Sequence, residues 1–232
     1  MDARSLMIGF VGMALGVGAA AQQKKDPSTL VGQDATLCGT VVSYMYQDDD
    51  CSVRLDLSQP HWRPLFYAKI PAEARAMFQN APEKQYLGQQ ICVSGTVTRD
   101  KKRVPYIAVT RRDQVQQTTA NSPRPDFGAG ATLACEKGVV SPKLVKEVRP
   151  SYPSGDLVRK GLEGLVLLDA VVSVDGTVTD TAVVFADVPE FSGAAEKALR
   201  EWKFKPATRD GIPLPVIVQV EMSFKLRLPS TK

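Results

Sequence analysis

The sequence of 232 residues predicts an α+β fold with two small domains joined by a linker. Residues 28–117 alternate short β-rich runs with turn residues, which is typical of a β-barrel. Residues 118–141 mix Gln, Thr, Ser, Pro and Gly without periodicity, which is typical of a linker. Residues 142–229 carry helix and strand patterns in the order α-β-β-α-β. We therefore expect a five-stranded barrel, followed by helices on one face of an antiparallel sheet.

The first domain has the element order of an OB-type barrel. Three strand patterns read "ATLCGTVVSYMY", "CSVRLDLS" and "LFYAKI". A short helical pattern follows Pro71, a residue that suits the first turn of a helix. The runs "QQICVSGTVTRD" and "VPYIAVT" then form a hairpin around a charged turn. Three strands, one helix and a hairpin place the helix between strands three and four of the barrel.

The second domain ends in the clearest strand pattern of the chain. Before it, "LVLLDAVVSVDGTVTDTAVVF" predicts a hairpin with Asp175 and Gly176 at the turn, and an apolar helical stripe runs to Trp202. From Val216 onward apolar and polar residues alternate. The polar outward set favours an edge strand, whose backbone N–H and C=O groups can pair with another chain. The alternatives are an ordinary sheet strand and pairing between two copies of this chain.

The N-terminal residues predict a secretory signal peptide over residues 1–21. An apolar run from Leu6 to Val17 precedes three alanines, whose small side chains suit a signal peptidase. The run is shorter than the roughly 20 apolar residues that span a bilayer. We therefore expect a periplasmic protein that begins at Gln22. The alternative is a retained inner-membrane anchor that leaves the rest of the chain facing the periplasm.

Four cysteines are consistent with an exported protein that contains disulfides. No two of Cys38, Cys51, Cys92 and Cys135 form a C-x-x-C pair, and with one histidine in the chain a Cys/His zinc site is not expected. Cys38 and Cys92 lie in the first and fourth strand patterns, which are neighbours in an OB barrel. We therefore expect a Cys38–Cys92 disulfide. Cys51 and Cys135 are then either paired with each other or free.

Several function classes find no support in the sequence. The net charge of +4 (29 basic minus 25 acidic) is too small to indicate binding of nucleic acid or anionic lipid. No Walker loop, G-x-S-x-G or H-E-x-x-H motif is present, so we expect no enzyme activity, metal or cofactor. In "REWKFKPA", Trp202 and Phe204 continue the apolar stripe while Lys203 and Lys205 alternate outward. We interpret this aromatic and basic run as structural.

Residues 142–229 contain the motifs "RPSYP", "VDGTV", "ALREWKFKPA" and "DGIPLPVIVQVEMSFKL". In this order they resemble the C-terminal domain of TonB-family energy-transducing proteins. The matching positions are Tyr152, Pro153, Asp175, Gly176, Trp202, Phe204, Pro206 and Gly211. The first domain more loosely resembles small exported OB-fold domains.

The resemblance implies a periplasmic binding domain linked to TonB-dependent transmembrane transport. Such a domain takes up a segment of an outer-membrane receptor, or another envelope protein, by adding it as a strand to its sheet edge. We expect partner binding on the last strand, at Val216, Val218, Gln219, Val220, Glu221, Ser223 and Lys225. The alternatives are an energy transducer anchored by residues 6–21 and a homodimeric envelope scaffold. Nucleic acid is not an expected partner, and the membrane is one only if the N-terminal segment is uncleaved.

Overall fold

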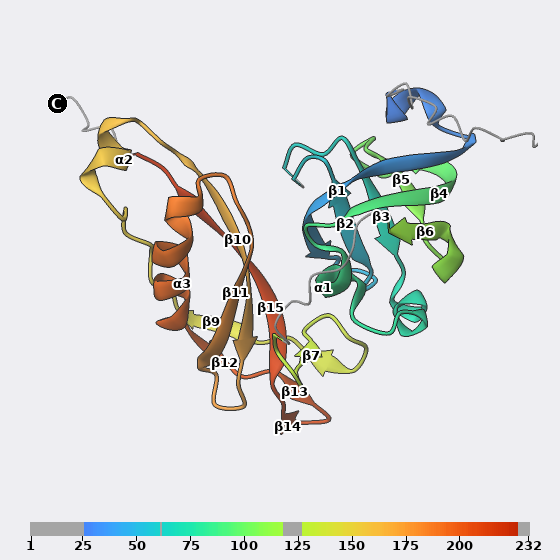
Figure 1. The fold of residues 1–232 in the computed structure, drawn as a ribbon. Helices are drawn as coiled ribbons and strands as arrows, with labels where there is room; N and C mark the ends of the chain where they lie inside the picture. The colour runs from blue at the N-terminus through green and yellow to red at the C-terminus, as the bar shows by residue number, and fades with distance from the viewer. Residues whose placement is uncertain (1–25, 61, 118–126, 227–232) are drawn as a thin grey trace, which may run out of the picture.

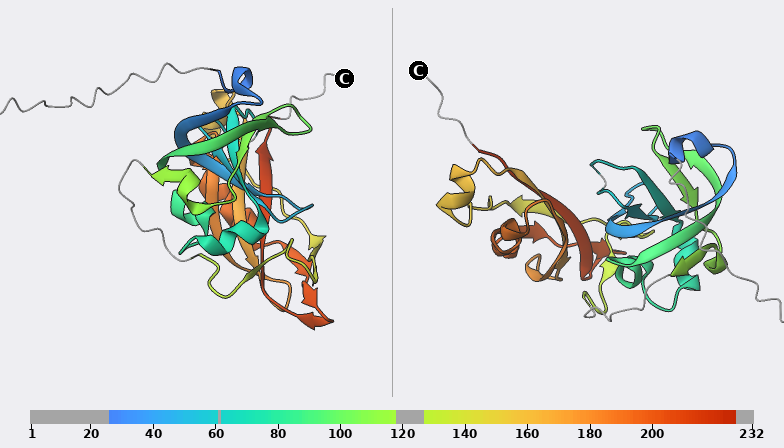
Figure 2. Two further views of the ribbon diagram at one scale, coloured as in Figure 1. Left: turned by 90° about the vertical axis from the view of Figure 1, so that its right-hand side faces the viewer. Right: turned by 45° about the horizontal axis from the view of Figure 1, so that its top comes forward.

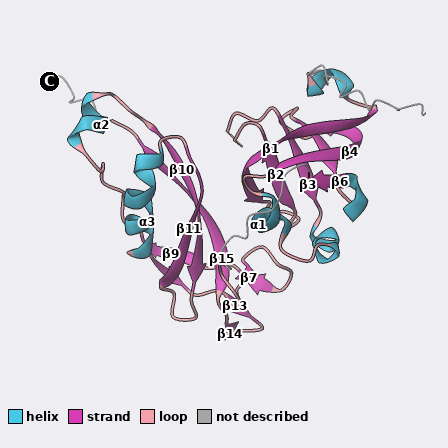
Figure 3. Ribbon diagram, in the orientation of Figure 1, coloured by secondary structure: helices cyan, strands magenta, loops and turns pink. Residues whose placement is uncertain are grey.

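The computed structural model describes residues 26–60, 62–117 and 127–226. Figure 1 shows a barrel coloured blue to green beside a second body coloured yellow to red. Strands dominate both bodies and the helices are short (Figure 3). The mixed α+β class expected from the sequence is therefore confirmed. The expected signal peptide, residues 1–21, lies outside the described residues.

The first body is a closed five-stranded barrel. Its strands lie in the order β1-β2-β3-β5-β4, and β4 pairs with β1 to close the ring. The strands are β1 Asp34–Tyr46, β2 Val53–Leu57, β3 Phe66–Ile70, β4 Gln90–Arg99 and β5 Pro105–Ala108, and β6 Val115–Gln117 adds to β4. The short helix η1 (Pro27–Leu30) precedes β1, and η2 Ala72–Met77, α1 Pro82–Tyr86 and η3 Arg112–Gln114 lie in the connections between strands.

The barrel encloses an apolar core because alternate strand residues point inward. Val41, Leu55 and Ile91 are fully buried there. Cys38 lies directly opposite Cys92 across β1 and β4, and the two form the disulfide expected from the sequence. This cross-link joins the pair of strands that closes the barrel, so it restricts opening at that seam.

The second body is a sheet with a helix on one face. The strand order is β11-β10-β15-β7, and β10 is antiparallel to both of its neighbours. Helix α3 packs Ala195 and Leu199 against the apolar face of the long strands. The main elements are α2 Gly155–Arg159, β10 Gly164–Val172, β11 Val178–Ala186, η4 Pro189–Phe191, α3 Ser192–Arg200 and β15 Val216–Phe224. Short strands complete the body: β9 Lys143–Lys146 pairs with β12 Lys203–Lys205, and β14 Ile212–Pro213 pairs with β13 Thr208–Arg209.

Part of the stretch expected to be a linker, residues 118–141, belongs to the second body instead. Strand β7 (Thr132–Leu133) pairs in parallel with β15, and β8 (Val139–Val140) pairs with β13. Leu133 is buried against Ile217. The linker is therefore shorter than its composition predicts, because two-residue strands in a Gly- and Thr-rich segment leave no periodic signal. Residues 118–126 lie outside the described part of the chain.

The barrel packs against the face of the sheet opposite α3. Leu167 of β10 joins the core of the barrel, and the ring centroids of Trp62 and Phe185 lie 5.0 Å apart in an edge-to-face contact. The second disulfide, Cys51–Cys135, links the barrel to the segment between β7 and β8. Figure 2 shows the two bodies from two further directions. The second cysteine pair thus fastens the barrel to the sheet.

Candidate functional site

In the described part of the chain, strand β15 pairs with β10 along the whole of one edge and with β7 over two residues of the other edge. On one side it pairs with β10 from Val216 to Phe224. On the other side it pairs with β7 at Val216 and Ile217. Among the described residues, no strand pairs with that second edge beyond Ile217. The edge expected from the sequence therefore begins at Val218, because β7 covers the edge at Val216.

The hydrogen-bond pattern shows which backbone groups point to the open edge. The Ala134 N–H donates to the carbonyl oxygen of Ile217 at 3.1 Å, so Ile217 faces away from β10. The register with β10 is continuous, and alternate residues of a strand bond to opposite sides. Gln219 and Ser223 therefore direct their backbone groups to the open edge, as Ile217 does. Val218 and Val220 direct theirs to β10.

The side chains of β15 divide between the two faces of the sheet. Val216, Met222 and Phe224 are buried on the face that carries α3, and Val218 and Val220 are half-buried there. The other face carries the polar set. Gln219 is half-buried against the barrel, whereas Glu221, Ser223 and Lys225 are exposed. Both faces agree with the alternation in the sequence, but the barrel covers part of the polar one.

Aromatic side chains fix the chain that runs beside this edge. The Trp202 indole N–H donates to the backbone carbonyl of Val148 at 2.8 Å. The rings of Phe191 and Phe224 stack with centroids 4.1 Å apart, and Tyr152 meets Phe224 edge-to-face at 5.8 Å. Such pairs add to the stability that burial alone provides. Tyr152 and Trp202 thus position the segment before α2.

The aromatic and basic run is part of this support. Trp202 is buried, Phe204 is half-buried, and Lys203 and Lys205 are exposed. Phe204 donates its backbone N–H to the carbonyl of Gly176 at 2.8 Å. The structure therefore places this run between the helix and the β10–β11 hairpin.

The remaining family-motif residues form turns. Gly176 has φ +82°, and a Cβ there would lie 1.8 Å from the carbonyl oxygen of Phe204 and 3.5 Å from Cδ of Pro206. Asp175 accepts the Thr177 backbone N–H at 2.9 Å, and hydrogen bonds from Ser173 and Thr177 lower its pKa to about 2.

Two further motif residues lie at the ends of elements. Gly211 has φ +80° in the turn between β13 and β14. Pro153 precedes Ser154, the residue that caps α2.

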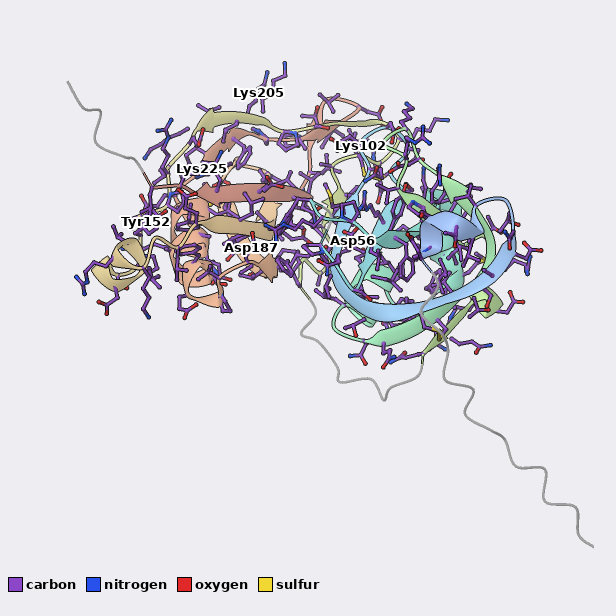
Figure 4. All side chains as sticks on the ribbon, turned by 90° about the horizontal axis from the view of Figure 1, so that it is seen from above. Asp56, Lys102, Tyr152, Asp187, Lys205 and Lys225 are labelled. Carbon is purple, nitrogen blue, oxygen red and sulfur yellow. A yellow bond between two sulfur atoms is a disulfide. The ribbon has the colours of Figure 1, made fainter. Side chains whose placement is uncertain are left out.

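Residues of the open edge line two hollows that share Trp202 and Glu221, and we call the two hollows together the edge groove. The first, of about 750 Å³, is lined by Glu147, by residues 149–152 and by residues 221–226. The second, of about 740 Å³, is lined by Ile217 to Glu221 and by Leu144, Trp202 and Phe204. The barrel contributes Met45, Tyr46 and Asp48 to the second hollow. Figure 4 labels Lys225 just after β15 and Lys205 on β12.

A buried carboxylate lies where the barrel meets the sheet, close to this groove. Asp169 of β10 is fully buried and accepts the Tyr44 hydroxyl at 2.6 Å and the Gln219 side-chain amide at 3.0 Å. Burial raises the pKa of Asp169 to about 7, although the two hydrogen bonds act in the opposite direction. Burial also raises the pKa of Tyr44 well above its ordinary range, and the nearby Asp169 adds to the effect. Sequence reasoning missed this group, although an acid inside the apolar run "LVLLDAVV" signals it.

A third hollow, of about 790 Å³, lies on the barrel at the basic β4–β5 hairpin. Arg99, Lys101 and Lys102 line it together with the acids Asp48 and Asp100. Both signs of charge are therefore present in this hollow.

Two further kinds of feature, metal-ligand clusters and membrane-spanning helices, are not found in the described residues. Within 26–60, 62–117 and 127–226, no three His, Cys, Asp or Glu residues gather in a way that could hold a metal ion. No helix in the same ranges has the length and apolar character needed to cross a bilayer.

The second body matches a known family of domains. Residues 148–226 match the family model "Gram-negative bacterial TonB protein C-terminal". Protein TonB of Vibrio cholerae serotype O1 (strain ATCC 39315 / El Tor Inaba N16961) is 31% identical over 91 residues, which are 38% of this chain and 36% of that protein. The chain thus spans about a third of the curated relative that it matches. Residues 148–226 therefore form a TonB-type C-terminal domain, and the resemblance stated from the sequence is confirmed.

Two solved structures are also similar to this chain. The solution NMR structure of the Pseudomonas aeruginosa TonB C-terminal domain is 21% identical, with a TM-score of 0.30 over 42% of this chain and 93% of that one. The TonB2 protein from Vibrio anguillarum is 29% identical, with a TM-score of 0.29 over 49% of this chain and 99% of that one.

Proposed function

We propose that this protein is a TonB-related binding protein of the cell envelope that takes up a peptide segment of an outer-membrane protein as an added strand on β15. The observation that carries the proposal is that, within the described residues 26–60, 62–117 and 127–226, strand pairing on the outer edge of β15 ends at Ile217. An added strand receives its affinity from backbone hydrogen bonds, and the outward groups of Gln219 and Ser223 are placed to supply them.

The open edge has the length of one ordinary strand. Residues 218–224 continue the pairing with β10 after β7 has ended. At about 3.3 Å per residue, seven residues correspond to roughly 20 Å of extended chain. A guest segment of five to seven residues, roughly the usual length of a strand, therefore fits this edge.

Pairing and packing hold the edge of β15 in place in the absence of a partner. β10 pairs with β15 along its full length, and α3 packs against the face behind it. Phe224 is fixed by its stack with Phe191, and Trp202 holds the neighbouring segment at Val148. Rigid edges bind more tightly, because less conformational entropy is lost on association.

We place this function in the periplasm and link it to TonB-dependent transport. The support is the match of residues 148–226 to TonB C-terminal domains, together with the signal-like residues 1–21. The alternatives are a transducer anchored by residues 6–21 and a homodimeric scaffold paired through β15. Intact mass of the mature protein separates the first of these, because a chain that begins at Gln22 has lost the anchor.

A proline at Ser223 tests strand addition. Its backbone N–H points to the open edge, so Ser223→Pro removes a donor to the guest while leaving the pairing with β10 in place. Val220 is less suitable, because its N–H bonds to β10 and a proline there disturbs the sheet itself. Ser223→Ala is the matched control, since it changes the side chain and keeps the donor.

The readout is photocrosslinking in intact cells from a reactive amino acid placed at Lys225. We expect a crosslinked outer-membrane protein with the parent sequence and with Ser223→Ala, and its loss with Ser223→Pro. Circular dichroism and thermal melting establish that the proline variant is folded. An unchanged adduct from a folded Ser223→Pro protein would show that strand addition at this edge is not the binding mode.

A further inference from the structure

We infer that the barrel is part of the peptide site: Met45, Tyr46 and Asp48 form one wall of the edge groove, and Asp48 selects a guest segment that carries a lysine or arginine. This inference rests on the proposed strand addition to β15. It gives the barrel a role in recognition, which the match to TonB C-terminal domains does not cover, because that match begins at residue 148.

The groove presents a different wall to each face of a guest strand. Side chains of an added strand point alternately to the two faces of the sheet. On the face that carries α3, the groove is lined by Leu144, Trp202 and Phe204. On the opposite face, Met45, Tyr46 and Asp48 of the barrel line it. Alternate guest side chains would therefore meet an apolar wall and a barrel wall.

The barrel wall is fixed to the strand that would receive the guest. The Gln219 side-chain amide donates to the backbone carbonyl of Tyr44 at 3.1 Å, immediately before Met45. The Tyr44 hydroxyl donates to buried Asp169 on the neighbouring strand β10. The disulfide Cys51–Cys135 ties the loop after β1 to the second body. The distance between wall and edge is therefore set by the fold.

Charge indicates what the barrel wall selects. Among the described residues that line the second hollow, the charged side chains are Asp48 and Glu221, and both are acidic. The first hollow instead combines Glu147 and Glu221 with Arg149 and Lys225. Asp48 is exposed, so a cationic side chain of the guest can reach it. Complementary charge therefore places a lysine or arginine of the guest near Ile217 to Glu221.

The apolar wall constrains the other guest side chains. Leu144 is 46% exposed although it lies in the hollow beside buried Trp202. An exposed leucine in a groove gains from contact with an apolar partner. The guest that fits best thus alternates apolar residues with polar ones and has a basic residue in the polar set.

Binding of synthetic peptides to the full chain tests this inference. The probes are fluorescent decapeptides of alternating Val and Thr, identical except for one central residue that is Lys, Gln or Glu. We expect the Lys peptide to bind more tightly than the Glu peptide in fluorescence anisotropy. Asp48→Asn should reduce affinity for the Lys peptide about two- to fivefold, the range typical of an exposed ion pair, and Asp48→Lys should reverse the preference.

The neighbouring residue supplies the control. Asp49 is exposed and lines the barrel hollows but not the edge groove, so Asp49→Asn should leave the peptide preference unchanged. A preference for the Lys peptide that persists in both Asp48→Asn and Asp48→Lys overturns the role of Asp48.

Ser223→Pro distinguishes this failure from failure of the proposed function. If Ser223→Pro removes peptide binding while Asp48 variants have no effect, strand addition stands and the barrel wall does not select charge. If no peptide binds, or if binding is indifferent to Ser223→Pro, strand addition itself fails. If light scattering shows instead a dimer that Ser223→Pro dissociates, the occupant is a second copy of this chain and the inference is wrong.

Discussion

At the scale of single residues, the buried carboxylate of Asp169 has a direct consequence for stability. It lies between the barrel and the sheet and accepts hydrogen bonds from Tyr44 and Gln219. Neither donor carries a charge, so burial dominates and raises the pKa to about 7. The protonated form is therefore favoured in the folded protein compared with the unfolded chain, where an aspartate has a pKa of about 3.9.

This difference predicts a pH dependence of stability. Because the folded-state pKa is raised, the stability that Asp169 contributes is fully present below about pH 4 and is lost as pH rises through about 7. The pKa rises by about three units, and each unit corresponds to about 1.4 kcal/mol of unfolding free energy. In Asp169→Asn, the unfolding free energy should therefore fall by up to about 4 kcal/mol less between pH 4 and pH 8 than in the parent protein. Urea unfolding of both proteins between pH 4 and 8 measures this pH dependence. An unchanged slope in the Asn variant would mean that another group titrates.

At the scale of elements, the β10–β11 hairpin shows how a turn can be tied to distant chain. Gly176 has a positive φ, and its carbonyl accepts the backbone N–H of Phe204 on β12. The sequence predicts this turn from the Asp-Gly pair. The contact with β12 requires the fold, because the two residues are far apart in the chain.

Two glycine-to-alanine substitutions distinguish the cost of a positive φ from the cost of a steric clash with a neighbouring atom. Both Gly176 and Gly211 have φ near +80°. A Cβ at Gly176 would meet the Phe204 carbonyl oxygen at 1.8 Å, whereas a Cβ at Gly211 has no atom within 4 Å. We expect Gly211→Ala to cost about 1 kcal/mol of unfolding free energy and Gly176→Ala about 3 kcal/mol or more. Equal losses in chemical denaturation would contradict the close approach of Phe204.

Strand β15 shows which part of the site was predictable from sequence. Its alternation places Val218 and Val220 on one face and Gln219 and Ser223 on the other, and both assignments agree with the structure. The coverage of Val216 by β7 was not predictable, because a parallel pairing of two residues leaves no pattern in the sequence. Nor does alternation show which backbone groups point to β10 and which to the open edge.

At the scale of the whole molecule, the contact between the two bodies is what sequence reasoning could least provide. The closed barrel and the Cys38–Cys92 disulfide follow from strand patterns and the order of elements. The junction depends on Tyr44, Asp169 and Gln219, whose contacts with one another do not follow from the strand patterns. Composition suggested a longer linker, whereas the second disulfide and the packing of Leu167 fasten the barrel to the sheet.

The junction also determines what the open edge can accept. The barrel leaves the edge of β15 open beyond Ile217 but covers part of the polar face behind it. A guest strand would therefore enter a groove with two built walls. In the proposed function, the outward backbone groups of alternate β15 residues form hydrogen bonds with this guest strand.

Residue-resolved amide hydrogen exchange by NMR reports directly whether these backbone groups form hydrogen bonds with a guest strand. Without a guest, the amides of Val218, Val220 and Met222 should exchange slowly because they bond to β10, and those of Gln219 and Ser223 should exchange faster. With a saturating guest peptide, Gln219 and Ser223 should become protected, while the even-numbered amides change little. Peptide binding that leaves Gln219 and Ser223 exchanging as before would contradict strand addition at β15.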